Sequence, residues 1–196
     1  PADFLAANTW SPATLASDLL AAHTRYLAHT RRMVALQEEL DWLTYSSYGL
    51  IDAVPTVAPD AIEPLAPGHR PFEIVLARKD DAADDDEKSA WWSRHGHERV
   101  SEIPDTHSPS LRERLQQRID LNESDVRLAL LETPPYKRRW QLADWESESK
   151  KAAESWLLDR LEDLFAHATD TAPAGPLAEP RPYRLEEITQ AWTLDP

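Results

Sequence analysis

The chain has 196 residues, a formal net charge of −14 at pH 7 and no cysteine. This acidic balance repels phosphate over the surface as a whole, and the lack of cysteine excludes disulfides, thiolate chemistry and cysteine zinc sites. Only four glycines argue against phosphate-cradling loops and a turn-rich all-β fold. No apolar run approaches the roughly 20 residues of a membrane-spanning helix and no signal peptide is visible, so we expect a cytoplasmic protein without a membrane partner.

The first 50 residues predict one long helix, running from about residue 12 to residue 48. Ser11 and Pro12 are typical of a helix start, and Gly49 stands where a left-handed residue would end the helix. Apolar residues recur along it with alternating spacings of four and three, a period of about 3.5 residues that is typical of coiled-coil-like or long bundle helices. This stripe, broken only by His29, is a candidate helix interface and consists of Leu15, Leu19, Ala22, Tyr26, Met33, Leu36, Leu40 and Leu43.

Residues 51–107 form a different kind of segment, which begins with five prolines between residues 51 and 71. Such a composition predicts an extended, irregular connection. Residues 72–77 are the best strand candidate, although they could also open a short helix. The acidic run 80–88 predicts a flexible, solvated loop, because it lacks the glycine and the spacing of a calcium loop. The pattern after it, over residues 91–103, is ambiguous.

Residues 108–168 predict two further amphipathic helices. Ser108 and Pro109 indicate a helix start, and Ser110 and Glu113 have the spacing of a capping box. The apolar face of this second helix is interrupted near residue 122, and two prolines at 134–135 end it. A third helix is expected over about residues 144–168. Residues 169–196 predict a linker and the start of a following segment.

The predicted fold class is therefore mainly α. We expect long antiparallel helices in a bundle or coiled-coil-like scaffold, with a proline-rich irregular middle segment and at most one or two short strands. Amphipathic helices can bury their apolar stripes only on each other, so the third helix and part of the second are expected to pack along the first.

The tetrapeptide Thr133-Pro134-Pro135-Tyr136 is similar to the Asn/Asp/Ser-Pro-Pro-Tyr/Phe motif that grips a flipped adenine in adenine methyltransferases. Threonine, however, lacks the amide or carboxylate that accepts both amino hydrogens. The tetrapeptide also follows a predicted helix rather than a parallel strand, and no glycine-rich cofactor loop precedes it. A double-proline helix stop is the favoured interpretation.

The histidines offer little evidence for chemistry. His95 and His97 flank a glycine, with His107 nearby, but zinc sites need three or four well-spaced ligands. The sequence therefore predicts a solvated turn there. His29, which lies on the apolar stripe, is interpreted as a core or interface histidine rather than a catalyst.

Basic residues are concentrated in residues 108–140, which carry a net charge of +2, whereas the rest of the chain carries −16. In this stretch Lys137, Arg138 and Arg139 precede Trp140, and guanidinium groups beside an aromatic ring can hold a phosphate. Together with Arg118, these three basic residues are the candidate contacts to a DNA backbone. The competing interpretation is that they form salt bridges with neighbouring acidic helices.

Two stretches carry a family resemblance. They are residues 35–50, beginning Ala35-Leu-Gln-Glu-Glu-Leu-Asp-Trp, and residues 118–140, ending Lys-Arg-Arg-Trp, with matching segments at 67–78 and 92–104 between them. In this order they make the chain resemble the C-terminal, non-catalytic part of PglX-like adenine-specific DNA methyltransferases of the BREX and phage-growth-limitation defence systems. Related segments occur in fused restriction-modification methyltransferases. Because the chain starts at Pro1 and its only methionine is Met33, we expect a fragment of a longer protein.

The resemblance implies S-adenosylmethionine as the cofactor of the longer protein, double-stranded DNA as its substrate and other defence-system subunits as possible partners. The catalytic and cofactor residues of the family have no match in this chain, so we expect no catalytic, cofactor-binding or metal-binding residue in it. The leading hypothesis is a non-catalytic helical scaffold that supports target recognition in phage defence. Two alternatives stay open: an acidic helical protein–protein interaction module without a methyltransferase parent, and an independent enzyme that uses the Thr133–Tyr136 turn or the histidines.

Overall fold

The structure is a computed structural model, which describes residues 1–7, 13–52, 56–85, 88–170, 184 and 186. Within these residues every regular element is a helix and no strand is present, so the prediction of a mainly α fold is confirmed. The predicted helix start at Ser11 and Pro12 and nearly all of the predicted linker and following segment, residues 169–196, lie outside the described residues.

The longest element is α2, Leu15–Ser47, with Thr14 as its N-cap residue. Its C-terminal end has the hydrogen bonds of a Schellman motif: Gly49 N donates to Ser46 O at 2.8 Å, and Leu50 N donates to Tyr45 O at 2.9 Å. Gly49 has a φ of 68°, which only glycine adopts without strain. The left-handed helix end predicted at this glycine is therefore confirmed.

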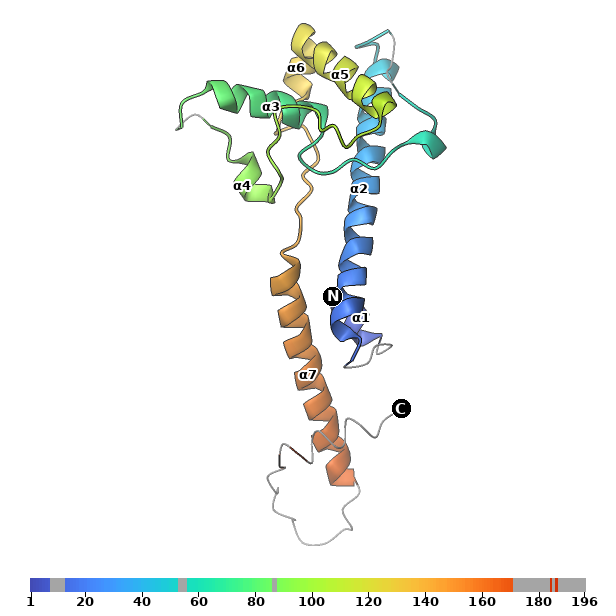
Figure 1. Cartoon of the computed structure of the whole chain (residues 1–196), viewed down its shortest axis with the longest axis vertical. Coiled ribbons are helices and arrows are strands. Elements are labelled where there is room, and N and C mark those ends of the chain that lie inside the picture. The colour runs from blue at the N-terminus through green and yellow to red at the C-terminus, as the bar shows by residue number, and fades with distance from the viewer. Residues whose placement is uncertain (8–12, 53–55, 86–87, 171–183, 185, 187–196) are drawn as a thin grey trace.

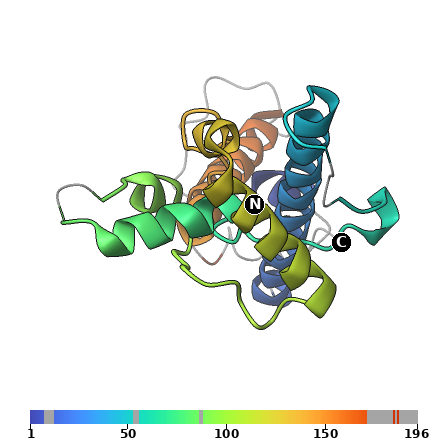
Figure 2. The same ribbon diagram turned by 90° about the horizontal axis from the view of Figure 1, so that it is seen from above.

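Three helices gather around the C-terminal half of α2 and form the head of the molecule: α3, Pro71–Ala82, α5, Pro109–Ser124, and α6, Val126–Leu131. Helix α5 crosses α2 and packs on both α3 and α6 (Figures 1 and 2). Val34 and Ala35 of α2 meet Leu111 and Leu115 of α5 in a shared hydrophobic core. Part of the second predicted helix thus packs on the first, as expected.

The start and the interruption of the second predicted helix have clear local causes. Ser108 is the N-cap of α5, because its Oγ accepts a hydrogen bond from Leu111 N at 3.1 Å. The cap is thus Ser108, and not the expected box of Ser110 and Glu113. Asp125 separates α5 from α6 and accepts from Arg127 N at 2.8 Å, which explains the break expected near residue 122.

Residues 72–77, the strand candidate, are helical and belong to α3, so the strand prediction is wrong. Pro71 occupies the first turn, and the Glu73 carboxylate accepts from Arg70 N at 3.3 Å. Phe72, Ile74 and their neighbours are buried on almost every side of this helix. A helix buried all round has no polar face, so its apolar run shows no helical period.

The acidic run does not begin as a solvated loop. Asp80 is buried inside α3, where its carboxylate accepts hydrogen bonds from Trp92 Nε1 at 2.8 Å and from Ser89 N at 3.0 Å. These bonds fix the short helix α4, Trp91–His95, against α3. Asp80 therefore acts as a structural acceptor, which corrects the prediction for this end of the run.

The proline-rich connection runs along α2 and contains one 3-10 turn, η1, Pro59–Ala61. Leu65 N donates to Arg31 O at 3.1 Å, and the Arg32 guanidinium donates to the carbonyls of Pro59 and Ile62. Ile62 and Leu65 are buried in the same core as Val34. The connection is irregular, as predicted, but it is held to α2 by the Arg32 side chain and by the backbone carbonyl of Arg31.

The last long helix is α7, Trp145–Asp170, and the contacts that its described side chains make with α2 lie near its own beginning. There the Trp145 ring stacks on His23 with centroids 4.7 Å apart, and Ala143 N donates to the Tyr26 hydroxyl at 3.3 Å. Helix α1, Ala2–Ala6, packs against α7, which then extends away from the head (Figure 1). The expected packing of this helix along α2 is therefore wrong over most of its length.

Replacing Gly68 with alanine is expected to lower the free energy of unfolding by about 2 kcal/mol. Gly68 has a φ of 97°, and a Cβ there would lie 2.2 Å from the carbonyl oxygen of Glu98. The matched control is Gly49→Ala, since Gly49 is also left-handed but has nothing within 4 Å of the added Cβ. Chemical unfolding should give the control a loss of only about 1 kcal/mol, and equal losses would contradict the close approach.

Candidate functional site

The connection from α6 to α7 passes between α3 and α2 (Figure 1) and contains the sequence Lys-Arg-Arg-Trp at 137–140, here called the basic segment. Two backbone carbonyls of this segment accept hydrogen bonds from buried side chains. Arg138 O accepts from Arg70 Nη1 at 2.9 Å, and Trp140 O accepts from His97 Nε2. Lys137 is buried, whereas Arg138 and Arg139 are exposed. The basic segment therefore sends its first cation inward and the next two outward.

Lys137 lies in a cluster of carboxylates. Its Nζ is 2.6 Å from Asp41, 2.8 Å from Glu132 and 3.7 Å from Glu38, and Tyr45 donates its hydroxyl to Glu132 at 2.5 Å. Burial alone would lower the pKa of Lys137, but the carboxylates of Glu38, Glu132 and Asp41 outweigh burial and raise it. This lysine is a permanently charged part of the core.

Arg118 is also an interior residue, with 1% of its surface exposed. Its Nη2 lies 2.8 Å from Glu39 of α2, and Arg114 Nε lies 3.3 Å from the other oxygen of the same carboxylate. A phosphate cannot reach Lys137 or Arg118 in this arrangement. The DNA-contact prediction is therefore corrected for these two residues, and the competing salt-bridge interpretation holds for them.

The second buried network centres on Glu73 of α3. Arg70 donates to both of its carboxylate oxygens, at 2.9 and 2.8 Å, and Gly68 N donates at 2.7 Å. Trp91 Nε1 and His97 Nδ1 complete the set at 3.0 and 2.7 Å. Burial would raise the pKa of Glu73, but the charge and hydrogen bonds of Arg70 and His97 hold it well below the usual range.

His97 joins this network to the basic segment. Its Nδ1 faces the Glu73 carboxylate and its Nε2 faces the Trp140 carbonyl, so the ring bridges α3 and the basic segment. His95 and His97 are each 6% exposed, so the predicted solvated turn is wrong. Burial, with His97 and Arg139 adding to it, lowers the pKa of His95.

The remaining histidines do not assemble into a metal centre. His69 Nδ1 lies 3.1 Å from His107 Nε2, and burial lowers the pKa of both rings. His29 is exposed on α2, which corrects its interpretation as a core residue. Among the described residues, no group of three or more histidine, aspartate or glutamate side chains is arranged to hold a metal ion.

The Thr133–Tyr136 tetrapeptide forms a turn directly after α6. Tyr136 N donates to Thr133 O at 3.0 Å, and Thr133 Oγ1 donates back to Leu130 O at 2.7 Å. The threonine hydroxyl is thus used to end a helix, and the Tyr136 ring is 64% exposed on the surface. This is the geometry of the predicted helix stop.

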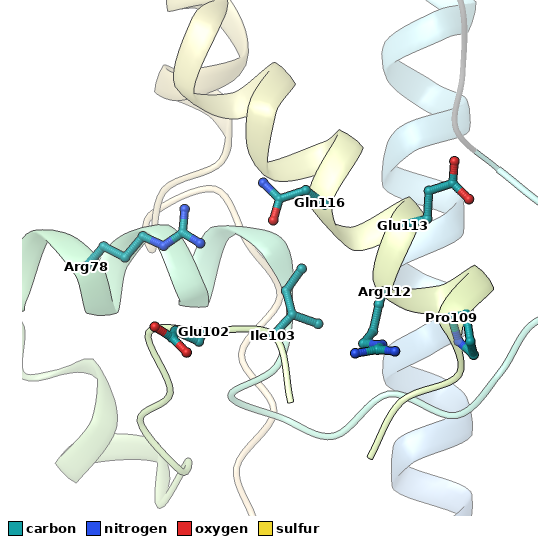
Figure 3. Close-up of a pocket in the computed structure, with 7 residues that line it drawn as sticks. All are labelled: Arg78, Glu102, Ile103, Pro109, Arg112, Glu113 and Gln116. Carbon is teal, nitrogen blue, oxygen red and sulfur yellow. The ribbon is translucent and has the colours of Figure 1, made fainter. Parts of the chain in front are cut away.

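One open surface pocket of about 550 Å³ lies between α3 and α5. Figure 3 shows its lining, in which two arginines and two glutamates alternate around Ile103. Arg78 is paired with Glu123 at 3.1 Å, and Arg112 is paired with Asp105 at 2.9 Å. Because both of its cations are already paired, the pocket offers no free cation to an anionic ligand.

The predicted apolar stripe of α2 lies mostly outside the core. Met33, Leu36, Leu40 and Leu43 are 41–56% exposed, and Leu15, Leu19 and Tyr26 are half-buried. The face that α2 buries in the head instead carries Val34, Ala35, Glu38, Glu39, Trp42 and Tyr45. The stripe therefore does not bind the helices of the head, and its role as an interface stays a prediction.

Sequence reasoning missed the residues that organise both networks, namely Arg70, Glu73 and His97 in one and Glu38, Asp41 and Glu132 in the other. Two features of the sequence could have indicated these residues. Glu38 and Glu39 stand among apolar residues of α2, where a charged side chain needs a buried partner. The second feature is the spacing of Arg70 and Glu73 around Pro71, which is typical of a side chain that binds back to the start of a helix.

The described residues thus define a helical domain whose interior cations and carboxylates neutralise one another, with a basic segment fixed on its surface. The chain belongs to the family described as "Domain of unknown function (DUF7008)", whose model matches residues 33–195. No solved structure matches the chain.

A curated relative agrees with the resemblance. The chain is 41% identical, over 94% of its own length, to the protein named "Adenine-specific methyltransferase PglX" from Streptomyces coelicolor (strain ATCC BAA-471 / A3(2) / M145). The predicted resemblance to PglX-like proteins is therefore confirmed. The chain spans 16% of the length of that relative. None of the helices in the described ranges is long and apolar enough to cross a membrane.

Proposed function

We propose that the chain is a non-catalytic helical scaffold region of a bacterial, S-adenosylmethionine-dependent, adenine-specific DNA methyltransferase that acts in phage defence. The observation that carries this proposal is its 41% identity, across nearly its whole length, to a protein named as an adenine-specific methyltransferase. The same match covers only 16% of that relative, which leaves ample chain for a catalytic domain elsewhere.

The chemistry of the described residues supports a scaffold role. The interior ionisable groups of the head are engaged in ion pairs and hydrogen bonds that join α2, α3, α5 and the basic segment. Such networks fix one arrangement of elements rather than activate a substrate. The scaffold would hold the target-recognition part of the methyltransferase in register, with α2 as its longest rigid element.

Removing residues 15–170 from the full-length methyltransferase is expected to preserve S-adenosylmethionine binding and to abolish methylation of the recognition sequence. A scaffold region leaves the cofactor pocket intact but is needed to bring DNA to it. Calorimetry measures the first quantity, and incorporation of labelled methyl groups into DNA measures the second. Loss of cofactor binding in the deletion variant, or cofactor binding by this chain alone, would contradict the proposal.

A second candidate function is that of an acidic helical interaction module without a methyltransferase parent. The exposure of Met33, Leu36, Leu40 and Leu43 on one face of α2 favours it, because single helices of soluble proteins rarely leave such a stripe uncovered. A dimer seen by light scattering and abolished by Leu36→Glu would support this function over the first.

A further inference from the structure

Two arginines from different parts of the chain, Arg94 and Arg139, lie near His95, and Arg138 directly precedes Arg139. Arg94 lies in the last turn of α4, and Arg138 and Arg139 lie in the basic segment. The two parts are joined by a hydrogen bond from Leu142 N to His95 O at 3.4 Å. Both Arg94 and Arg139 act electrostatically on the His95 ring, where they add to the effects of burial and of His97. All three arginines are exposed. Together they form what is here called the arginine surface.

The charges of the arginine surface are not neutralised by carboxylates, unlike those of most other arginines of the head. Within the described part of the chain, no carboxylate forms an ion pair with Arg94, Arg138 or Arg139. Seven guanidinium groups elsewhere in the head do have such partners: Arg70, Arg78, Arg99, Arg112, Arg114, Arg118 and Arg127. Arg31 and Arg32 of α2 have none among the described residues, but Arg32 is engaged by the carbonyls of Pro59 and Ile62. Three neighbouring cations without counter-charges attract an anion, even on a chain of net negative charge.

The buried networks hold this surface in place. Arg70 binds the carbonyl of Arg138 at 2.9 Å, and His97 binds that of Trp140. Between these two tethers, the Arg138 guanidinium lies over the Trp140 ring at 4.5 Å from its centroid. Because the backbone and one guanidinium are already positioned, binding an anion orders little additional chain.

The overall charge of −14 does not decide whether this surface can bind phosphate. Charges farther away than the Debye length, about 10 Å at 0.1 M salt, are largely screened. The residues that follow the basic segment, Gln141, Leu142 and Ala143, are uncharged. Even when Glu98 and Asp144, the carboxylates nearest to these arginines in sequence, are counted, the three guanidinium groups keep the local charge positive.

We propose that Arg94, Arg138 and Arg139 contact the phosphate backbone of double-stranded DNA. This inference rests on the proposed function and adds Arg94 to the predicted contact residues. Guanidinium groups bind phosphate oxygens in a bidentate way, which suits positioning rather than base reading. The Trp140 ring is covered by Arg138 and packs against the hydrophobic core, so it is not free to stack on an unpaired base.

The test is the salt dependence of duplex binding by the full-length methyltransferase. In the triple variant Arg94→Ala, Arg138→Ala, Arg139→Ala, the slope of log affinity against log salt should become shallower by about 2.7, since each lost phosphate contact removes about 0.9. The loss of affinity should be the same for duplexes with and without the recognition sequence. Fluorescence anisotropy with labelled duplexes measures both quantities.

The matched control removes the same charge elsewhere. Arg25, Lys79 and Lys150 are exposed and form no ion pair among the described residues, so the triple alanine variant at these positions should keep the wild-type slope. Equal slopes in the two triple variants would overturn the proposal, as would a loss of binding confined to single-stranded DNA. Cofactor binding and methylation by the deletion variant test the scaffold proposal separately, so the two failures are distinguishable.

Discussion

Replacing Lys137 with methionine is expected to lower the free energy of unfolding by about 3–5 kcal/mol. Methionine fills a similar volume but leaves the carboxylates of Glu38, Asp41 and Glu132 buried without their cation. Three carboxylates around one site repel each other. The donors that remain, the Tyr45 hydroxyl on Glu132, Trp42 Nε1 on Glu38 and Gln37 Nε2 on Asp41, carry no charge to offset that repulsion. Urea unfolding followed by tryptophan fluorescence measures the loss.

The neighbouring residue supplies the control. Arg138 is exposed and has no ion-pair partner among the described residues, so Arg138→Met loses only its stacking on Trp140 and should change the free energy of unfolding by no more than about 1 kcal/mol. Adding Glu132→Gln to Lys137→Met should recover part of the loss, because fewer carboxylates are then left without a partner. Similar losses for Lys137→Met and Arg138→Met would show that the lysine is not a buried ion-pair partner.

The parts of the fold that could be predicted from sequence are those with local causes. The end of α2 depends on Gly49 alone, and the start of α5 depends on Ser108 and Pro109. Such signals act within a few residues, so they give the same result in any tertiary context. The strand candidate failed because the first half of α3 is buried on nearly all sides, so residues 72–77 lack the period that identifies a helix.

The buried face of α2 could not be predicted in this way. The period of about 3.5 residues correctly indicated a long helix, but the head covers Glu38, Glu39 and Trp42 rather than the apolar stripe. These carboxylates can be buried only because Arg118 and Lys137, distant in sequence, supply counter-charges. Pairing between distant residues leaves no periodic mark in a single sequence.

Contacts between residues distant in sequence also decide the candidate site. The composition of the basic segment indicated that cations and an aromatic ring stand together, but not which cations face inward. That choice depends on the acidic cluster beneath Lys137 and on the tethers from Arg70 and His97 to the backbone. Arg94 was missed because it belongs to a short helix whose position depends on the buried Asp80.

The second large effect is expected for Glu73→Gln, which should lower the free energy of unfolding by about 3–5 kcal/mol at neutral pH. The amide keeps the shape of the side chain but removes the charge that Arg70 faces at 2.8 Å. In the wild type, Arg70, Gly68, Trp91 and His97 all donate hydrogen bonds to the Glu73 carboxylate. The NH₂ group of the glutamine must therefore face one of these donors. A buried donor that meets another donor adds to the loss. Urea unfolding of the chain measures this difference.

The pH dependence of the same variant tests the cause. The folded pKa of Glu73 is held well below its unfolded value of about 4.3, so its stabilising contribution is complete above that pH and is lost as the pH falls below it. Between neutral pH and about pH 3, the wild-type chain should therefore lose more stability than Glu73→Gln, and the two curves should converge. Glu113→Gln, at an exposed position without an ion pair among the described residues, should run parallel to the wild type. If the Glu73→Gln curve also ran parallel, its loss at neutral pH would come from packing and not from the buried charge.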